Sequence, residues 1–262
     1  DMLERVRNDH PETWAQLSDT YAREIRRGVH DDERHRQRLA GLLRVPSMLH
    51  EEPRTLDAYL ADHPDGVYCL TAPSKQCVRD HPLLERFAAE GIDVLLFDMP
   101  IDEFMLLALT SYAGKPVQNV SRKGISLPWP EPEVSKDVLD FCAWATAKLK
   151  GRVEEVRPTH MLLSSPCCIS VRSWANTANM GRISSAQAMG GHQKLGRDGC
   201  VMEVNPAMLG HVLSVQDEEQ AALELEFMYN VACLSCGFDV AQPATLARTI
   251  FERAAPAALA VE

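Results

Sequence analysis

The sequence has no long hydrophobic run and no excess of positive charge. No stretch approaches the ~18 consecutive apolar residues of a membrane-spanning helix, and the N-terminus lacks the charged start and apolar core of a signal peptide. With 37 acidic against 27 basic residues, the formal charge of −10 at pH 7 disfavours a general electrostatic grip on nucleic acid or anionic lipid. We therefore predict a soluble protein with no nucleic acid and no membrane among its partners.

Familiar catalytic motifs are also absent. The chain has no Gly-x-Ser-x-Gly, His-Glu-x-x-His or Gly-x-Gly-x-x-Gly, and its nine histidines are scattered. The segment Gly191–Gly196 has the glycine spacing of a phosphate-binding loop, but Arg197 and Asp198 follow where Lys and Ser or Thr are needed. We predict no catalytic residue, no metal site and no cofactor in this chain.

The eight cysteines do not form a zinc or disulfide pattern. Only Cys233 and Cys236 make a Cys-x-x-Cys pair, and no second pair accompanies them. They lie within a helical pattern of apolar residues, where positions i and i+3 share a face. We predict small buried thiols, and a redox role for this pair is the alternative.

What the sequence does contain is enough apolar material to build a core. Hydrophobic residues make up 45% of 262 positions, which suits one large domain or two of ordinary size. The first ~45 residues predict two helices around a turn at Gly28. Acidic residues interleave the arginines of this region, which predicts a solvated helix face for Arg23, Arg26, Arg27, Arg34, Arg36 and Arg38.

A strand–helix–strand unit follows. Short apolar runs at 67–70 and 94–97 enclose a helical segment at 82–90, and this order predicts parallel pairing through a right-handed crossover. A helix at 101–112 then begins after Pro100, with Asp102 and Glu103 in the first turn that the helix dipole favours for acids, and a strand is predicted at 117–120. One alternative function belongs here, an α/β enzyme with a small-molecule site at the strand ends near Leu70 and Phe97, built from Thr71, Ser74, Lys75 and Asp98.

Alternating prolines mark a boundary. Pro128, Pro130 and Pro132 disfavour both helix and sheet, so we predict a linker at 125–136 between domains at 1–124 and 137–262. Beyond the linker we expect a helix at 135–150, strands at 153–156 and 169–171, a Gly-rich loop at 190–199, and closing helices at 217–236 and 244–259. The fold class is α+β, a small α/β layer followed by an α+β domain that ends in helices.

The closing helices each carry an apolar stripe. The stripes are Leu223, Phe227, Val231 and Leu234 on one helix, and Leu246, Ile250 and Ala254 on the other. Such helices pack either on their own domain or against a second chain in a four-helix bundle, and spacing alone does not choose between them.

A further segment places large apolar residues among small polar ones. Trp174, Asn176 and Met180 lead into Ile183 at helical spacing. The pattern fits an amphipathic helix packed on its own domain, or an exposed adaptable surface for apolar partners, since Met repacks against varied shapes.

Several strings, taken in order, resemble the Hsp90 chaperone family from about residue 12 to residue 253. They include Pro100-Ile101-Asp102-Glu103-Phe104, Ser165-Pro166-Cys167-Cys168, Thr177-Ala178-Asn179-Met180, Glu203-Val204-Asn205-Pro206 and Ser235-Cys236-Gly237-Phe238. Two departures are Asn176, where eukaryotic members commonly have Trp, and Met161, where the family usually has Arg.

The resemblance implies the later part of an Hsp90 middle domain followed by the C-terminal dimerisation domain. It implies a homodimer through the closing helices, binding of client proteins at Trp174, Asn176, Met180 and Ile183, and co-chaperones as further partners. ATP and Mg belong to a part of the parent upstream of residue 1, so this fragment is expected to have no ATPase activity of its own. The expected location is cytoplasmic, with a mitochondrial or endoplasmic-reticulum paralogue as the alternative.

Overall fold

The computed structural model describes residues 2–130, 133–187 and 198–255. The first helices are α1 (Met2–Asp9), α2 (Pro11–Thr20), α3 (Ala22–Asp31), α4 (Arg36–Ala40) and α5 (Leu56–Asp62). The next elements are β1 (Val67–Thr71), α6 (Lys75–Arg79), the 3-10 helix η1 (Pro82–Leu84), α7 (Glu85–Ala89), β2 (Leu95–Phe97), α8 (Pro100–Ala108), β3 (Ser111–Tyr112) and β4 (Lys115–Asn119). The remainder are α9 (Lys136–Lys148), β5 (Glu155–Pro158), β6 (Cys167–Val171), α10 (Ala178–Gln187), β7 (Cys200–Val204), η2 (Pro206–Met208), α11 (Gly210–Leu213), α12 (Glu218–Ser235) and α13 (Pro243–Ala254).

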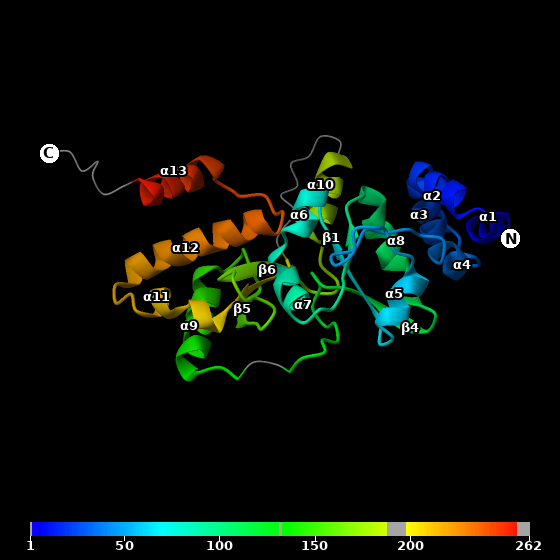
Figure 1. Ribbon diagram of the computed structural model, residues 1–262. Helices are drawn as coiled ribbons and strands as arrows, with labels where there is room; N and C mark the ends of the chain where they lie inside the picture. Colours follow the sequence, from blue (N-terminus) through cyan, green and yellow to red (C-terminus); the bar gives the residue numbers. More distant parts are fainter. Residues whose placement is uncertain (1, 131–132, 188–197, 256–262) are drawn as a thin grey trace.

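Two small sheets organise the molecule, and the helices of the two chain ends lie at opposite sides of it (Figure 1). The first sheet has the order β2-β1-β4-β3, with β1 parallel to β2 and to β4. The second has the order β5-β7-β6, with β7 parallel to β5 and antiparallel to β6. The predicted strand–helix–strand unit is confirmed, and the mixture of helices and small sheets agrees with the α+β class.

The first sheet separates two hydrophobic cores. Successive side chains of a strand point to opposite faces, so Leu70 and Leu96 enter the larger core while Cys69 and Leu95 enter the smaller one. The larger core also includes Cys168 of β6 and side chains of α9 and α12. One continuous core therefore joins residues from both sides of the proline-rich segment.

The predicted turn at Gly28 is wrong. Helix α3 runs through this residue and ends at Asp31. A Cβ atom built on Gly28 would lie 3.1 Å from Cδ1 of Leu39 in α4. The glycine therefore serves the close approach of two helices, which local sequence does not distinguish from a turn.

The solvated face predicted for the arginines is also wrong for Arg26. Its Nε donates to Oδ1 of Asp102 on α8 at 2.6 Å, and both side chains are buried. Asp102 Oδ2 accepts from the backbone N–H of Met99 at 2.9 Å, which caps the start of α8 as its place in the first turn suggested. Burial raises the pKa of Asp102 to about 6, against the opposing effect of Arg26.

Helix α8 is shorter than predicted, because it ends at Ala108 and residues 111–112 form β3. Ala113 and Gly114 follow with positive φ angles of 48° and 77°. The chain reverses direction there, and β4 runs antiparallel to β3. A tight hairpin with left-handed residues at its turn is typical of such a connection.

Strand β7 has no counterpart among the predicted elements. All five of its residues are buried, including Glu203 in the middle of the run. Lys123, from the loop after β4, compensates this charge with Nζ 2.5 Å from Oε1 of Glu203. In the sequence, Glu203 interrupts the apolar run that would otherwise indicate a strand. Its burial is not apparent there, because the lysine that compensates its charge is distant in sequence.

The proline-rich segment packs on the first sheet's helices where it is described. The Trp129 ring meets the Phe87 ring edge-on with 5.0 Å between centroids, and the Arg86 guanidinium lies over the same indole. The domain boundaries at 124 and 137 stay a prediction. None of the helices in the described ranges is long and apolar enough to cross a bilayer.

Candidate functional site

The four residues predicted as a binding surface lie at and just before α10, at differing depths. Trp174 is 67% exposed and Asn176 is also exposed, whereas Ile183 is half-buried. Met180 is only 8% exposed. The segment thus presents its first two members to solvent and turns Met180 toward the protein.

Helix α10 is fastened to α8 at its first turn. The hydroxyl of Thr177 accepts from the backbone N–H of Met180 at 3.1 Å, which caps the helix, and donates to Oε1 of Glu103 at 2.8 Å. Thr177 and Glu103 are both buried. Arg122 holds the preceding loop through the carbonyls of Ser173 and Ala175, at 2.7 and 2.9 Å.

Helix α12 has an inward and an outward apolar face. Leu225, Tyr229 and Cys233 are buried against the larger core. The predicted stripe is the other face, where Leu223 and Leu234 are 59% and 53% exposed and Phe227 and Val231 are half-buried. A helix that is apolar on both faces leaves one of them without cover inside a single chain.

Helix α13 faces α12 across an open groove of about 1300 Å³. Leu246 is buried at the contact between the two helices, while Ile250 and Ala254 are exposed. The groove is lined by apolar residues of α12 and α13, by charged residues such as Glu224 and Arg253, and by residues at and just before the start of α10, among them Leu223, Phe227, Leu246, Asn176, Ala178 and Gly181. The candidate binding segment and the candidate dimer face therefore border the same hollow.

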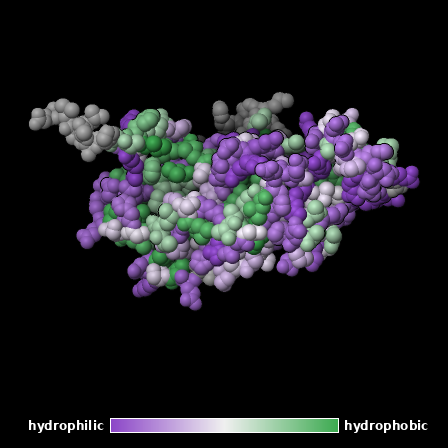
Figure 2. All heavy atoms as spheres, viewed as in Figure 1, coloured by the Kyte–Doolittle hydropathy of each residue, from purple (hydrophilic) through white to green (hydrophobic). Residues whose placement is uncertain are grey.

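One prominent residue of this surface was missed by the sequence reasoning. Phe251 is 72% exposed on α13, next to Ile250. The predicted stripe takes every fourth residue from Leu246 and therefore leaves out Phe251. A phenylalanine adjacent to Ile250 nevertheless widens the apolar face of the helix. Figure 2 shows hydrophobic atoms gathered around α12 and α13, and hydrophilic atoms predominating over the N-terminal helices.

The thiols that could support redox chemistry are inaccessible. Cys233 and Cys236 are both buried, and Cys236 Sγ accepts from the backbone N–H of Ile169 at 3.2 Å. Cys167 and Cys168 are buried in β6, and burial raises the pKa of the Cys167 thiol to about 12. Against the effect of burial, hydrogen bonds with Cys168 and His81 lower the pKa of the Cys236 thiol, so it is the burial of these thiols, which limits the access of an oxidant, that argues against a redox role.

The strand ends proposed for an enzyme site are filled by structural contacts. Thr71 is buried and accepts from Nδ2 of Asn119 at 3.1 Å, and Ser74 caps α6 through the backbone N–H of Cys77. Neither the groove at α12 nor a smaller cavity of about 390 Å³ beside Lys123 and Trp129 is lined by Thr71, Ser74, Lys75 or Asp98. The geometry of the described residues gives the enzyme alternative no support.

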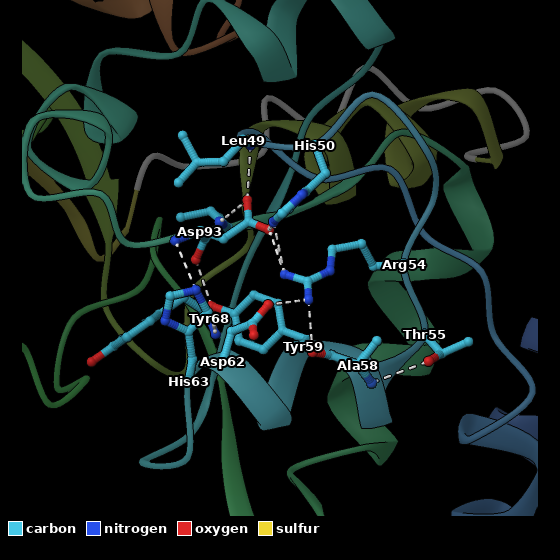
Figure 3. Close-up of polar contacts among 11 residues, drawn as sticks. Leu49, His50, Arg54, Thr55, Ala58, Tyr59, Asp62, His63, Tyr68 and Asp93 are labelled. Atoms are coloured by element: carbon cyan, nitrogen blue, oxygen red, sulfur yellow. Dashed lines mark hydrogen bonds and ion pairs between the residues drawn. The ribbon is translucent and has the colours of Figure 1, made fainter.

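A cluster of titratable side chains surrounds Asp93 (Figure 3). The buried Asp93 carboxylate accepts from the Leu49 N–H at 3.0 Å and pairs with Arg54 at 3.4 Å, while Arg54 also pairs with Asp62. The Tyr59 hydroxyl donates to the Asp93 carbonyl, and burial raises the pKa of Tyr59. The polar groups of this cluster are engaged in hydrogen bonds and ion pairs with one another. These contacts hold the loop before α5 against the residues that lead into β2.

Within the described ranges, no three His, Cys, Asp or Glu side chains are gathered so that they could hold a metal ion. The segment Gly191–Gly196, with the glycine spacing of a phosphate-binding loop, lies outside the described residues.

Comparison with known proteins gives one consistent result. The family model described as "Hsp90 protein" matches residues 1–258. A chaperone protein HtpG of Halorhodospira halophila is 34% identical over 221 residues, which cover 79% of this chain and 34% of that protein. The HtpG of Mycobacterium tuberculosis is 28% identical over 272 residues, covering 97% of this chain and 41% of its own length.

An endoplasmin homolog of Catharanthus roseus is 27% identical over 254 residues, covering 91% of this chain and 31% of the relative. The chain therefore spans between about a third and two fifths of the length of these relatives.

Proposed function

The chain belongs to the Hsp90 family, and from this premise we propose that it is the client-binding and dimerising part of an ATP-dependent Hsp90-type chaperone. Residues 1–124 would be the later part of the middle domain and residues 137–262 the C-terminal dimerisation domain, joined by the linker at 125–136. ATP and Mg would bind in a part of the parent outside this chain. The chain itself would have no enzymatic activity.

The uncovered apolar face of α12 and α13 is the observation that carries the dimer proposal. Leu223, Leu234, Ile250 and Phe251 leave this face exposed, although large apolar side chains are rarely left in contact with water over a wide patch. A second copy of the same helices is self-complementary about a twofold axis and would complete a four-helix bundle. A stable dimer buries about 1,200 Å² or more in total.

Sedimentation velocity at micromolar concentration tests the dimer. The wild-type chain should sediment as a dimer and Leu234→Glu as a monomer, because a carboxylate would be desolvated at the interface. Leu139 on α9 is similarly exposed, at 49%, so Leu139→Glu is the matched control and should remain dimeric. A monomeric wild-type chain would overturn the proposal, as would a dimeric Leu234→Glu.

Client binding is proposed for the surface around Trp174, Asn176, Met180 and Ile183. The exposed indole of Trp174 supports it, since an aromatic side chain supplies a large contact area at low entropic cost, and Asn176 two residues later lines the groove. The partner would be an unfolded or partly folded protein with exposed apolar side chains.

Suppression of the aggregation of heat-denatured citrate synthase tests this site. Trp174→Ser should suppress aggregation less well than the wild-type chain, whereas Tyr21→Ser, which changes an exposed aromatic on the N-terminal helices, should have no effect. Met180→Asp should also weaken suppression, provided that circular dichroism shows it folded. Equal suppression by the wild type and Trp174→Ser would remove Trp174 from the site.

Two further parts of the proposal rest on the family alone. Co-chaperones would be additional partners, and the location would be the cytoplasm, because two of the relatives described above are bacterial. The endoplasmin homolog keeps the endoplasmic reticulum as the alternative, and cell fractionation with an antibody to the chain separates the two.

A further inference from the structure

A buried hydroxyl at the start of α10 joins this helix to α8, next to the buried side chains of Asn179 and Met180. Thr177 Oγ1 donates to Glu103 Oε1 at 2.8 Å and accepts from the Met180 N–H at 3.1 Å. A threonine hydroxyl offers one hydrogen to donate, so this bond commits it to Glu103. Both side chains are buried, and the bond joins residues 74 positions apart in sequence.

The electrostatics of this contact favour an ordered start of α10. The first turn of a helix carries unpaired N–H groups and a partial positive charge, and the Glu103 carboxylate lies at that end. A hydrogen bond to a charged acceptor is stronger than one between neutral groups, particularly in a buried position. The carboxylate therefore fixes the Thr177 hydroxyl in the orientation that caps the helix.

The neighbouring contacts are less favourable. Asn179 is buried beside this junction, and its Nδ2 has no hydrogen-bond partner among the residues that the structure describes. A buried amide without a partner weakens the contact in which it lies. Arg182 of α10 also pairs with Asp239 at 3.7 Å, but both side chains are exposed and such pairs contribute little, so the buried Thr177–Glu103 bond is the stronger polar contact of this helix.

We propose that Glu103 and Thr177 are positioning residues that set the place of α10 and thereby the presentation of its client-binding side chains. This inference rests on the client-binding function proposed above. Glu103 lies on α8, whose neighbouring residue Asp102 is paired with Arg26 of α3. A partner that moves α8 would therefore act on the client-binding segment by way of the Thr177–Glu103 bond.

Hydrogen–deuterium exchange of the α10 amides tests the positioning directly. Thr177→Val keeps the shape of the side chain but removes both hydrogen bonds, so exchange across residues 180–184 should rise by about tenfold, the size of effect that loss of a helix cap produces. Thr177→Ser keeps the hydroxyl and should restore slow exchange. Thr55 caps α5 by the same kind of bond, so Thr55→Val is a matched control that should raise exchange in α5 only.

Glu103→Ala provides a second route to the same result without changing α10. It should raise exchange across residues 180–184, and the double variant Glu103→Ala/Thr177→Val should exchange no faster than Thr177→Val alone, because both changes remove one shared interaction. Unchanged α10 exchange in Thr177→Val and Glu103→Ala would overturn the proposal.

Aggregation suppression then separates this inference from the function on which it rests. Thr177→Val should suppress aggregation of heat-denatured citrate synthase less well than wild type, with Thr177→Ser and Thr55→Val at wild-type level. If Trp174→Ser weakens suppression but Thr177→Val does not, the positioning role is refuted while client binding stands. If neither Trp174→Ser nor a folded Met180→Asp weakens suppression, the client site is refuted, and the exchange measurements still decide whether the pair orders α10.

Discussion

The helices at the two ends of the molecule turn different side chains to solvent. Helices α1–α4 expose charged residues that pair with one another, as Arg38 does with Glu4 at 2.6 Å and Arg27 with Asp31 at 3.1 Å. Helices α12 and α13 instead expose Leu223, Leu234 and Phe251. Both regions also contain buried side chains, such as Val29 in α3 and Tyr229 in α12, so burial alone does not separate them. The outer face does: exposed apolar side chains are few and separate in the N-terminal helices, as at Met2 and Tyr21, whereas α12 and α13 expose several leucine, isoleucine and phenylalanine side chains that a further chain could cover.

Removing one partner of the buried ion pair should give the largest loss of stability at the N-terminal end. Arg26→Met leaves the Asp102 carboxylate buried without its cation, which should lower the free energy of unfolding by about 3–5 kcal/mol. The double variant Arg26→Met/Asp102→Leu should recover most of it, since no charge is then left buried. Urea unfolding measures both. If Arg26→Met lowered the free energy of unfolding by less than about 1 kcal/mol, the Arg26–Asp102 pair would be solvent-exposed. The contrast between the buried and exposed faces of the N-terminal helices would then be weaker.

At the other end, two neighbouring leucines of α12 should behave differently. Leu225 is buried and Leu225→Ala should cost about 3 kcal/mol through lost contacts and a cavity. Leu223→Ala, on the outward face, should change the stability of the folded monomer by no more than about 0.5 kcal/mol. Unfolding is to be followed at a concentration where sedimentation shows monomer. Equal costs for the two variants would mean that the two faces of α12 are wrongly assigned.

The buried carboxylate should also give the N-terminal end a pH dependence. The folded-state pKa of Asp102 is about 6 against an ordinary 3.8, so the folded protein holds this proton more tightly than the unfolded chain. The resulting stabilisation is complete below pH 3.8 and is lost as the pH rises through about 6. A shift of about 2 units corresponds to roughly 2.7 kcal/mol.

Comparison of the wild type with Asp102→Asn isolates this titration. The free energy of unfolding of the wild type minus that of the variant should fall by roughly 2.7 kcal/mol from about pH 4 to about pH 7. Leu225→Ala, measured at the same pH values, should show a constant loss because no titratable group is removed. A constant difference for Asp102→Asn as well would contradict the raised pKa.

The smallest effects on folding should come from exposed aromatics, and they sharpen the contrast most directly. Tyr21→Ser and Phe251→Ser should each change monomer stability by no more than about 0.5 kcal/mol. Phe251→Ser should nevertheless raise the dissociation constant of the dimer, while Tyr21→Ser should leave it unchanged. Sedimentation equilibrium measures both. An equal effect of the two substitutions on the dissociation constant would show that Phe251 of α13 contributes no more to dimer formation than Tyr21, which lies between α2 and α3.

Local sequence was sufficient for the elements whose signals are local. The apolar runs of β1 and β2, the helix start at Pro100 and the closing helix at 217–236 follow from periodicity and capping, and the structure confirms each. The last helix, predicted at 244–259, ends at Ala254, and residues 256–259 lie outside the described residues. The inward and outward faces of α12 were harder, because its apolar residues surround the helix and the stripe chosen from spacing is the outward one.

The features that sequence did not predict each depend on a distant partner. Arg26 is buried because Asp102 meets it, and Glu203 lies inside β7 because Lys123 compensates its charge. The sequence alone identifies Thr177 only as a small polar residue, because its role depends on the hydrogen bond with Glu103. A charged or polar residue predicts exposure unless its partner is known, and a single sequence does not show which distant residue that partner is.

The composition of the larger core affects how the chain can fold while it is being synthesised. Leu70 and Leu96 form part of this core, but Cys168 and Leu225, which lie in it with them, are synthesised much later. Synthesis proceeds from the N-terminus, so this face of the first sheet is covered only in part, by side chains such as Val78, Leu83 and Phe87, until β6 and α12 have emerged from the ribosome. Contacts between such distant positions slow folding and prolong the exposure of apolar surface. During its own synthesis the first half of this chain therefore exposes apolar surface that side chains of the second half later cover.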